Sequence, residues 1–165
     1  MIAAAILLAG FGTNANAQAT DYATATAVLV TPISIAKSAD MHFGTLAASG
    51  TAGTVVLNYA NATTPFGGVS KPAGGISPTT ASFTVTGEGT SGFSIAFPAS
   101  ITLTSGVNTM SVAISSEAGT ASTLVGGTKV IKFGGTLSVA AAQPGGTYLN
   151  DEVDNTGLYV TVNYN

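Results

Sequence analysis

The sequence contains no cysteine, no tryptophan and a single histidine, and charged residues make up only 7% of it. Without cysteine the chain has no disulfides, no thiolate chemistry and no cysteine-based zinc site, and one histidine cannot form a histidine cluster around a metal. The basic residues are lysines alone and the net charge is −3, so no basic stripe can neutralise phosphates or hold an anionic membrane. We therefore expect no cofactor, no metal ion, no nucleic-acid partner and no stable membrane insertion.

Candidate catalytic groups are equally scarce. A serine or threonine nucleophile needs a base within reach, and His42 is the only histidine. Asp40 and His42 would share one face of an extended strand, but no Gly-x-Ser-x-Gly turn occurs in the chain. We interpret His42 as a solvent-facing strand residue and predict that the protein is not an enzyme.

Acidic residues gather once, between Asn150 and Gly157. Oxygen-bearing side chains at alternating positions before a glycine are typical of calcium loops. The spacing fails here, because neither the glycine nor a bidentate glutamate stands where an EF-hand loop requires it. A solvated turn is the better interpretation of this segment.

Glycine, threonine, serine, alanine and valine dominate the rest of the chain, which has 21 glycines. Helical periodicity is missing, whereas period-two alternation recurs between glycine-containing turns. This pattern predicts an all-β fold, an antiparallel β-sandwich with an immunoglobulin-like layout; a closed barrel is the alternative. The candidate strands are residues 24–30, 33–35, 54–59, 81–87, 93–97, 101–103, 110–114, 129–141 and 158–164.

Composition also divides the chain into segments. Residues 2–11 are apolar but too few to span a bilayer, which takes about 20 residues, and Ala-x-Ala patterns ending at Ala17 and Ala19 follow. We therefore predict a signal peptide over 1–19, cleaved after Ala17 or Ala19, an N-terminal extension over 20–30 and one β-sandwich domain over 31–165. Within that domain, residues 61–80 hold three of the six prolines and four glycines, and we expect them to be a long connection between sheets.

The C-terminal segment has the most specific pattern. One face of it is apolar and ends in the penultimate tyrosine, because Leu158, Val160, Val162 and Tyr164 alternate with Tyr159, Thr161 and Asn163. This ending resembles the subunits of chaperone-usher fimbriae, above all the archaic branch related to spore coat protein U. The order of further segments fits as well, namely 23–30, 32–35, 40–44, 83–87, 134–139 and 143–148. The chain is thus similar to an uncharacterised family of bacterial secreted, pilin-like domains.

The resemblance implies an incomplete sandwich that lacks its last strand. A periplasmic chaperone would fill the groove temporarily, and the N-terminal extension of the next subunit would fill it permanently by β-augmentation. The implied function is a structural subunit of an extracellular filament, a polymer of copies of itself, exported through the periplasm to the cell surface with a chaperone and an outer-membrane usher. The disulfide of classical subunits is absent, so packing alone must stabilise the sandwich.

Two sets of residues are assigned to this assembly. For the donor strand we favour Thr24, Thr26, Val28 and Val30, because β-branched side chains suit a pleated groove; the opposite face, Ala23, Ala25, Ala27 and Leu29, is the alternative. For the groove edge offered to the chaperone we expect Leu158, Val160, Val162 and Tyr164.

A different class of function stays open, a secreted monomeric β-sandwich that acts as an adhesin or surface-binding domain. Such a domain would be expected to present an aromatic platform on one exposed face. The candidates are Tyr59, Tyr148 and Tyr159, although tyrosines that pair across strands are the simpler explanation.

Overall fold

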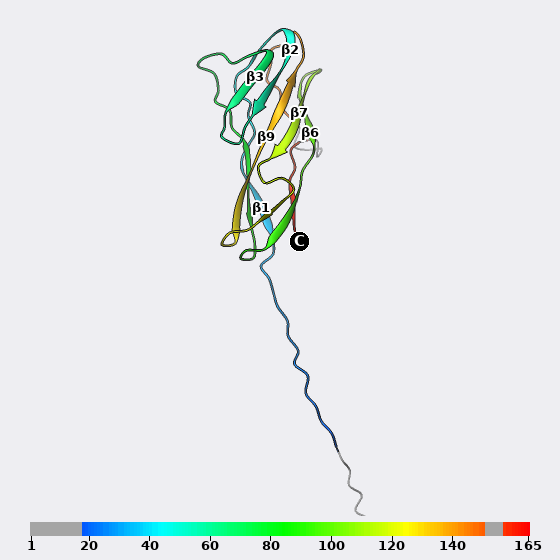
Figure 1. Cartoon of the computed structure of the whole chain (residues 1–165). Helices are drawn as coiled ribbons and strands as arrows, with labels where there is room; N and C mark the ends of the chain where they lie inside the picture. Colours follow the sequence, from blue (N-terminus) through cyan, green and yellow to red (C-terminus); the bar gives the residue numbers. More distant parts are fainter. Residues whose placement is uncertain (1–17, 151–156) are drawn as a thin grey trace, which may run out of the picture.

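The computed structural model describes residues 18–150 and 157–165 (Figure 1). These residues form β-strands joined by turns and loops, and no helix among them is long and apolar enough to cross a membrane. The strands are β1 (Ser34–Ala39), β2 (Ala47–Leu57), β3 (Thr63–Ser70), β4 (Ala81–Thr86), β5 (Gly92–Ala96), β6 (Ser100–Ser105), β7 (Asn108–Ser116), β8 (Ala121–Thr123), β9 (Thr128–Val139) and β10 (Thr161–Tyr164). The expected all-β antiparallel fold is confirmed. The predicted signal peptide lies almost entirely on residues 1–17, outside the described part of the chain.

The long strand β9 is the centre of the larger, seven-stranded sheet. Its first half pairs with β4 and its second half with β2, while β7 pairs along residues 133–138. Because a strand has only two edges and these pairings overlap, β4 and β2 lie end to end along one edge of β9 and β7 lies along the other. The sheet continues from β4 to β1, from β2 to β3 and from β7 to β6.

Two glycines let β9 hold neighbours on both edges at its midpoint. A Cβ atom on Gly134 would collide with the carbonyl oxygen of Leu57, and one on Gly135 would lie 2.6 Å from that of Ala113. Both obstacles are backbone atoms, which cannot rotate aside as a side chain would. The Gly134–Gly135 pair therefore marks the point where the partner of β9 changes from β4 to β2.

The smaller sheet has the strand order β10-β5-β8 and packs on the inner face of the larger one. Thr161 pairs with Ala96 and Tyr164 with Phe93. Between the sheets, the Phe133 ring meets the rings of Phe83 and Phe97 edge-on, with centroids 5.6 and 5.2 Å apart. The buried residues of this cluster are Ala81, Val85, Phe93, Ile95, Leu124, Ile131, Phe133 and Val162.

The other half of the larger sheet has no strands facing it in the described chain. Its inner face buries a second cluster, and loop residues 41–46 and 143–150 lie over it. The cluster consists of Phe43, Val55, Leu57, Val69, Ile101, Val112, Leu137 and Val139, none of which comes from the smaller sheet. The molecule thus has one half with sheet on sheet and one half with loops on sheet.

Residues 61–80 correct one sequence expectation. They are not a plain connection, because β3 lies within them and pairs with β2. Pro65 is tolerated since β3 is an edge strand, and Gly67, with φ of 67°, stands where the register between β2 and β3 shifts. The closed barrel is also not formed, because within the described chain β1, β3 and β6 end the larger sheet without closing on one another.

Candidate functional site

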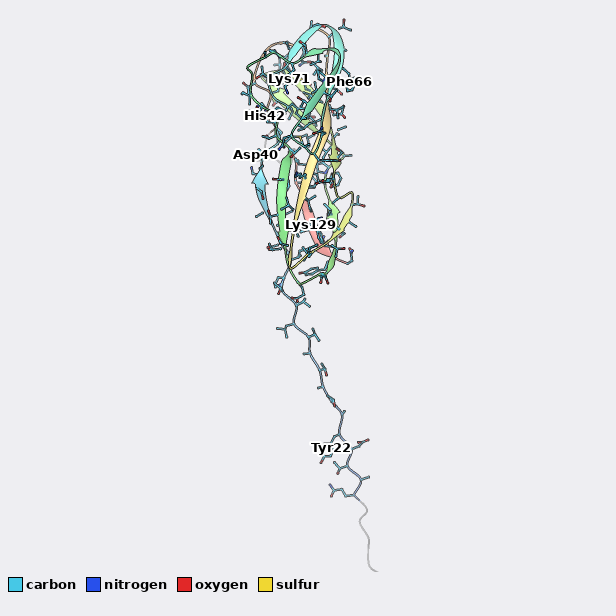
Figure 2. The ribbon with its side chains drawn as sticks, turned by 60° about the vertical axis from the view of Figure 1, so that its left-hand side comes forward. Tyr22, Asp40, His42, Phe66, Lys71 and Lys129 are labelled. Atoms are coloured by element: carbon cyan, nitrogen blue, oxygen red, sulfur yellow. The ribbon has the colours of Figure 1, made fainter. Side chains whose placement is uncertain are left out.

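The N-terminal tail, residues 18–32, runs away from one end of the sandwich as extended chain without a strand partner (Figure 1). Its apolar side chains lie in solvent, since Val28 is 83% exposed and Leu29 is 92% exposed. Tyr22 lies far out along the tail (Figure 2). Val28, Leu29 and Val30 are consecutive, so these side chains expose apolar surface side by side.

Both faces of the tail are open to solvent. The favoured donor residues are all exposed, and so are those of the opposite face. The favoured set is Thr24, Thr26, Val28 and Val30, and the opposite set is Ala23, Ala25, Ala27 and Leu29. The choice between the two faces stays a prediction.

At its root the tail is held by two side chains. The backbone N–H of Thr31 donates to Glu88 Oε2 over 2.9 Å, and the Tyr164 hydroxyl donates to the Thr31 carbonyl oxygen over 2.7 Å. The same hydroxyl accepts a hydrogen bond of 2.6 Å from the backbone N–H of Glu88. The bond from the Thr31 N–H stabilises the carboxylate and so lowers the pKa of Glu88. We call Thr31, Glu88 and Tyr164 the tail anchor.

The C-terminal segment carries the alternation predicted for it. The side chains of Leu158, Val160, Val162 and Tyr164 pack against the core, and the residues between them are exposed. These predicted groove-edge side chains thus face the interior of their own domain. The backbone is what stays open, because β10 pairs with β5 on one edge and with no described strand on the other. An added strand would extend the smaller sheet beside β10.

An apolar hollow of about 440 Å³ lies in the half of the molecule that the smaller sheet does not cover. The inner face of the larger sheet is its floor, and residues 41–46 and 143–150 are its walls. No lysine, aspartate or glutamate of the described chain lines it. The floor consists of Val69, Ile101, Leu103, Met110, Val112, Leu137 and Val139. This volume and lining suit apolar side chains.

The hollow and the tail lie at opposite ends of the molecule. Leu137 and Val139, at the end of β9, line the hollow. The beginning of β9 lies beside the tail anchor, where the Gly87 N–H donates to the Gly127 carbonyl oxygen over 3.0 Å. A strand as long as β9 spans about 40 Å at about 3.3 Å per residue. Figure 1 shows the same arrangement, with the tail leaving from the end opposite β2 and β3.

Asp40 and His42 lie near each other without forming a catalytic pair (Figure 2). The Asp40 carboxylate makes an ion pair of 2.6 Å with Lys37. His42 Nδ1 accepts a hydrogen bond of 2.7 Å from the Gly44 N–H, and its backbone pairs with Thr79. His42 is exposed, as predicted, and its ring stabilises the turn that Gly44 completes with a φ of 83°.

The remaining candidates are placed as follows. Most of the acidic segment, residues 151–156, lies outside the described part of the chain. Residues 18–150 and 157–165 contain no group of three or more histidine, aspartate or glutamate side chains that could hold a metal ion. Tyr59, Tyr148 and Tyr159 come from three separate segments. The Tyr148 hydroxyl donates to the Pro144 carbonyl oxygen over 2.8 Å and accepts from Gln143 Nε2 over 3.0 Å, so this tyrosine stabilises a wall of the hollow.

Sequence reasoning missed both the hollow and Glu88. The hollow is lined by residues from several strands and two loops, so no local pattern reveals it. Glu88 stands between two glycines and reads as an ordinary turn residue. The one local signal for the tail anchor is Pro32, which restricts the conformation of Thr31 before it.

The fold and the tail together define an antiparallel β-sandwich domain with an unpaired, exposed N-terminal segment. A comparison with protein families matches residues 33–164 to a family described as a domain of unknown function, DUF4402. The chain belongs to this family. Searches of curated proteins and of solved structures found no match. The matched range coincides with the sandwich and leaves out the tail.

Proposed function

We propose that this protein is a structural subunit of an extracellular filament, in which the tail of one copy fills the open half of the next copy. The observation that supports this function is the combination of an exposed apolar tail at one end with an apolar hollow at the other. The open edge of β10 lies in the other half of the molecule and provides backbone partners for an added strand, so a donated tail would run from the hollow along β10.

The length and placement of the tail suit this role. Residues 18–30 reach up to about 45 Å when fully extended, which is close to the length of β9. Because the tail and the hollow lie at opposite ends, each contact between copies would be head-to-tail. Head-to-tail contacts that do not close into a ring build open filaments.

The energy of such a joint comes mainly from apolar burial. Fully burying one valine or leucine contributes roughly 1.5–3 kcal/mol, so the exposed Val28, Leu29 or Val30 side chains that enter a groove each add an amount of this order. Backbone hydrogen bonds along β10 would add register and specificity. The low content of charge in the chain allows neighbouring subunits to approach closely.

The proposal includes export to the cell surface with a periplasmic chaperone and an outer-membrane usher. The chaperone would occupy the open edge of β10 until a neighbouring tail replaces it. Deleting residues 159–165 removes β10 and should abolish secretion of stable subunit. Unchanged secretion of the shortened chain would contradict the chaperone proposal.

The assembly itself is tested by size-exclusion chromatography and electron microscopy of the chain from residue 18 onward. We expect filaments from the intact chain and monomers from a variant that lacks residues 20–30. A matched control replaces residues 20–30 by glycine and serine at equal length, which keeps the tail but removes its apolar side chains. Folded monomers from all three proteins would contradict the filament proposal.

A second experiment relies on disulfide crosslinking. Because the chain has no cysteine, a disulfide between two introduced cysteines identifies the contact between those two positions. Val28→Cys in one copy should form a disulfide with Leu103→Cys, in the hollow, of a second copy. Ser138→Cys is the matched control, because it is exposed on β9 between the inward-facing Leu137 and Val139. Mass spectrometry of separately tagged copies identifies the mixed dimer. Equal linkage to Leu103→Cys and Ser138→Cys would contradict docking in the hollow.

A further inference from the structure

The tail anchor fixes both peptide groups that flank one residue. The N–H of Thr31 bonds to Glu88 and its carbonyl oxygen accepts from Tyr164. These two groups belong to the peptide planes on either side of the Thr31 Cα atom, so the bonds restrict its φ and ψ together. Pro32 adds to this restriction, because proline has a fixed φ and keeps the residue before it extended. The direction of the tail is thus set at Thr31.

The anchor rests on the end of the sandwich where the two sheets pack together. Tyr164 lies in β10 opposite Phe93, which is fully buried. The turn that carries Glu88 is bonded to Gly127 on both sides, through the Gly87 N–H and the Gly89 carbonyl oxygen. A Cβ atom on Gly87 would collide with the Tyr164 hydroxyl, so only glycine at this position lets the hydroxyl reach Thr31 and Glu88.

We propose that the tail anchor fixes the direction in which residues 18–30 leave the domain, so that the tail is presented to a second copy and does not fold back on its own sandwich. Glu88 and Tyr164 act here as positioning residues. The identity of the acceptor, a second copy of this chain, rests on the proposed function. The hydrogen bonds of the anchor are a property of the single molecule.

The length of the tail makes folding back a real competitor. At about 45 Å the extended tail is about as long as β9, the longest strand of the sandwich. A flexible attached segment reaches its own domain at an effective concentration in the millimolar range, roughly a thousandfold above subunits present at micromolar concentration. An unanchored tail would therefore pair first with its own domain, with residues 28–30 beside the nearby β10, and the anchor disfavours that outcome by directing the chain outward, as Figure 1 shows.

The test compares the anchor variants Tyr164→Phe and Glu88→Ala with the intact chain from residue 18 onward. Tyr164→Phe keeps the ring in the core and removes only the hydroxyl. Glu88→Gln is the conservative variant, because its amide oxygen can still accept from the Thr31 N–H. Tyr159→Phe and Glu117→Ala are the matched controls, since they make the same chemical changes at exposed residues outside the anchor.

Two quantities are measured on dilute monomer. The first is hydrogen exchange of the Thr31 amide by nuclear magnetic resonance. The second is the paramagnetic relaxation that a nitroxide label on the tail causes in the sandwich. The label is attached to Tyr22→Cys, which is the single cysteine of that protein. Labelled chains are diluted into unlabelled ones, so that only the approach of a tail to its own sandwich is seen. We expect Glu88→Ala to speed Thr31 exchange about tenfold, as the loss of one hydrogen bond does, and Glu88→Gln to restore protection. We expect both anchor variants to bring the label close to the sandwich.

The anchor proposal is overturned if the Thr31 amide exchanges equally fast in all variants. It is also overturned if exchange rises in the anchor variants while the label stays equally distant from the sandwich. Its failure is distinguishable from failure of the proposed function, because both readouts come from the monomer. An intact chain that forms no filaments counts against the filament alone. Filaments that form equally well from Tyr164→Phe, with no change in the position of the label, count against the anchor alone.

Discussion

Alanine substitutions in the tail should reveal which of its faces enters the neighbouring subunit. Val28 and Val30 are 83% and 59% exposed, and both lie on the favoured face, whereas Leu29 is 92% exposed on the other. Valine to alanine removes two carbon groups, worth about 0.8 kcal/mol each when fully buried. Scaled by the area still available for burial, the double variant Val28→Ala with Val30→Ala should lose about 2 kcal/mol, which corresponds to roughly a 30-fold weaker joint.

The assay is the binding of a fluorescent peptide of residues 18–32 to the chain that lacks residues 20–30. This deletion spares the sandwich, because the tail anchor begins at Thr31. The double-alanine peptide should bind roughly 30-fold more weakly, and a Leu29→Ala peptide should change by less than about threefold. A larger loss for Leu29→Ala would show that the alanine-rich face enters the groove. Equal binding of all three peptides would refute strand donation.

Three further predictions concern the sandwich and the anchor. Because its bond from Thr31 lowers the pKa of Glu88 below the ordinary 4.5, the anchor bond has its full, charge-assisted strength above that pH and weakens as the pH falls through the lowered pKa. A protonated carboxyl group still accepts a hydrogen bond, so protection of the Thr31 amide in the intact chain should fall over this range to about the level of Glu88→Gln, in which it should be independent of pH. Phe133→Ala should lower the free energy of unfolding, measured in urea, by about 3–5 kcal/mol. Phe66→Ala, at a half-exposed residue, should change the same free energy by no more than about 0.5 kcal/mol. Equal losses in the two variants would contradict the assigned core. Gly134→Ala should lower the free energy of unfolding by about 1–3 kcal/mol, because its Cβ atom would collide with the carbonyl oxygen of Leu57. Gly145→Ala is the control in the same experiment, since a Cβ atom there has no neighbour within 4 Å.

The sequence predicted the strands better than their partners. Alternation over residues 158–164 correctly placed Val162 and Tyr164 on the inner face, because side-chain direction in a strand depends on local order alone. The prolines and glycines of residues 61–80 concealed β3, since an edge strand tolerates residues that a central strand excludes. Contacts between distant residues were out of reach altogether. The bond between Thr31 and Tyr164 joins residues just before the first strand and at the end of the last one, and neither local sequence indicates that they meet.

The edges of the two sheets differ in how they are protected, and the difference identifies the edge available to a partner. Exposed strand edges invite pairing with other chains, and proteins protect them with charge, proline, bulges, short strands or covering segments. In the described chain, β1 carries Lys37 beside an irregularity in its register, β3 carries Pro65 and a shifted register, and β6 is bridged by Leu149.

The smaller sheet completes this comparison. Both of its edge strands are short, with three residues in β8 and four in β10, and β10 contains no charge and no proline. The pairing of β10 with β5 shows no irregularity of register, and no described segment pairs with its outer edge. A chain with so few charged residues would aggregate through such an edge unless a partner covered it. The outer edge of β10, which has neither charge, proline nor an irregular register, is therefore the one beside which the exposed apolar residues of the tail begin. They begin at the anchor that Tyr164 of β10 itself completes.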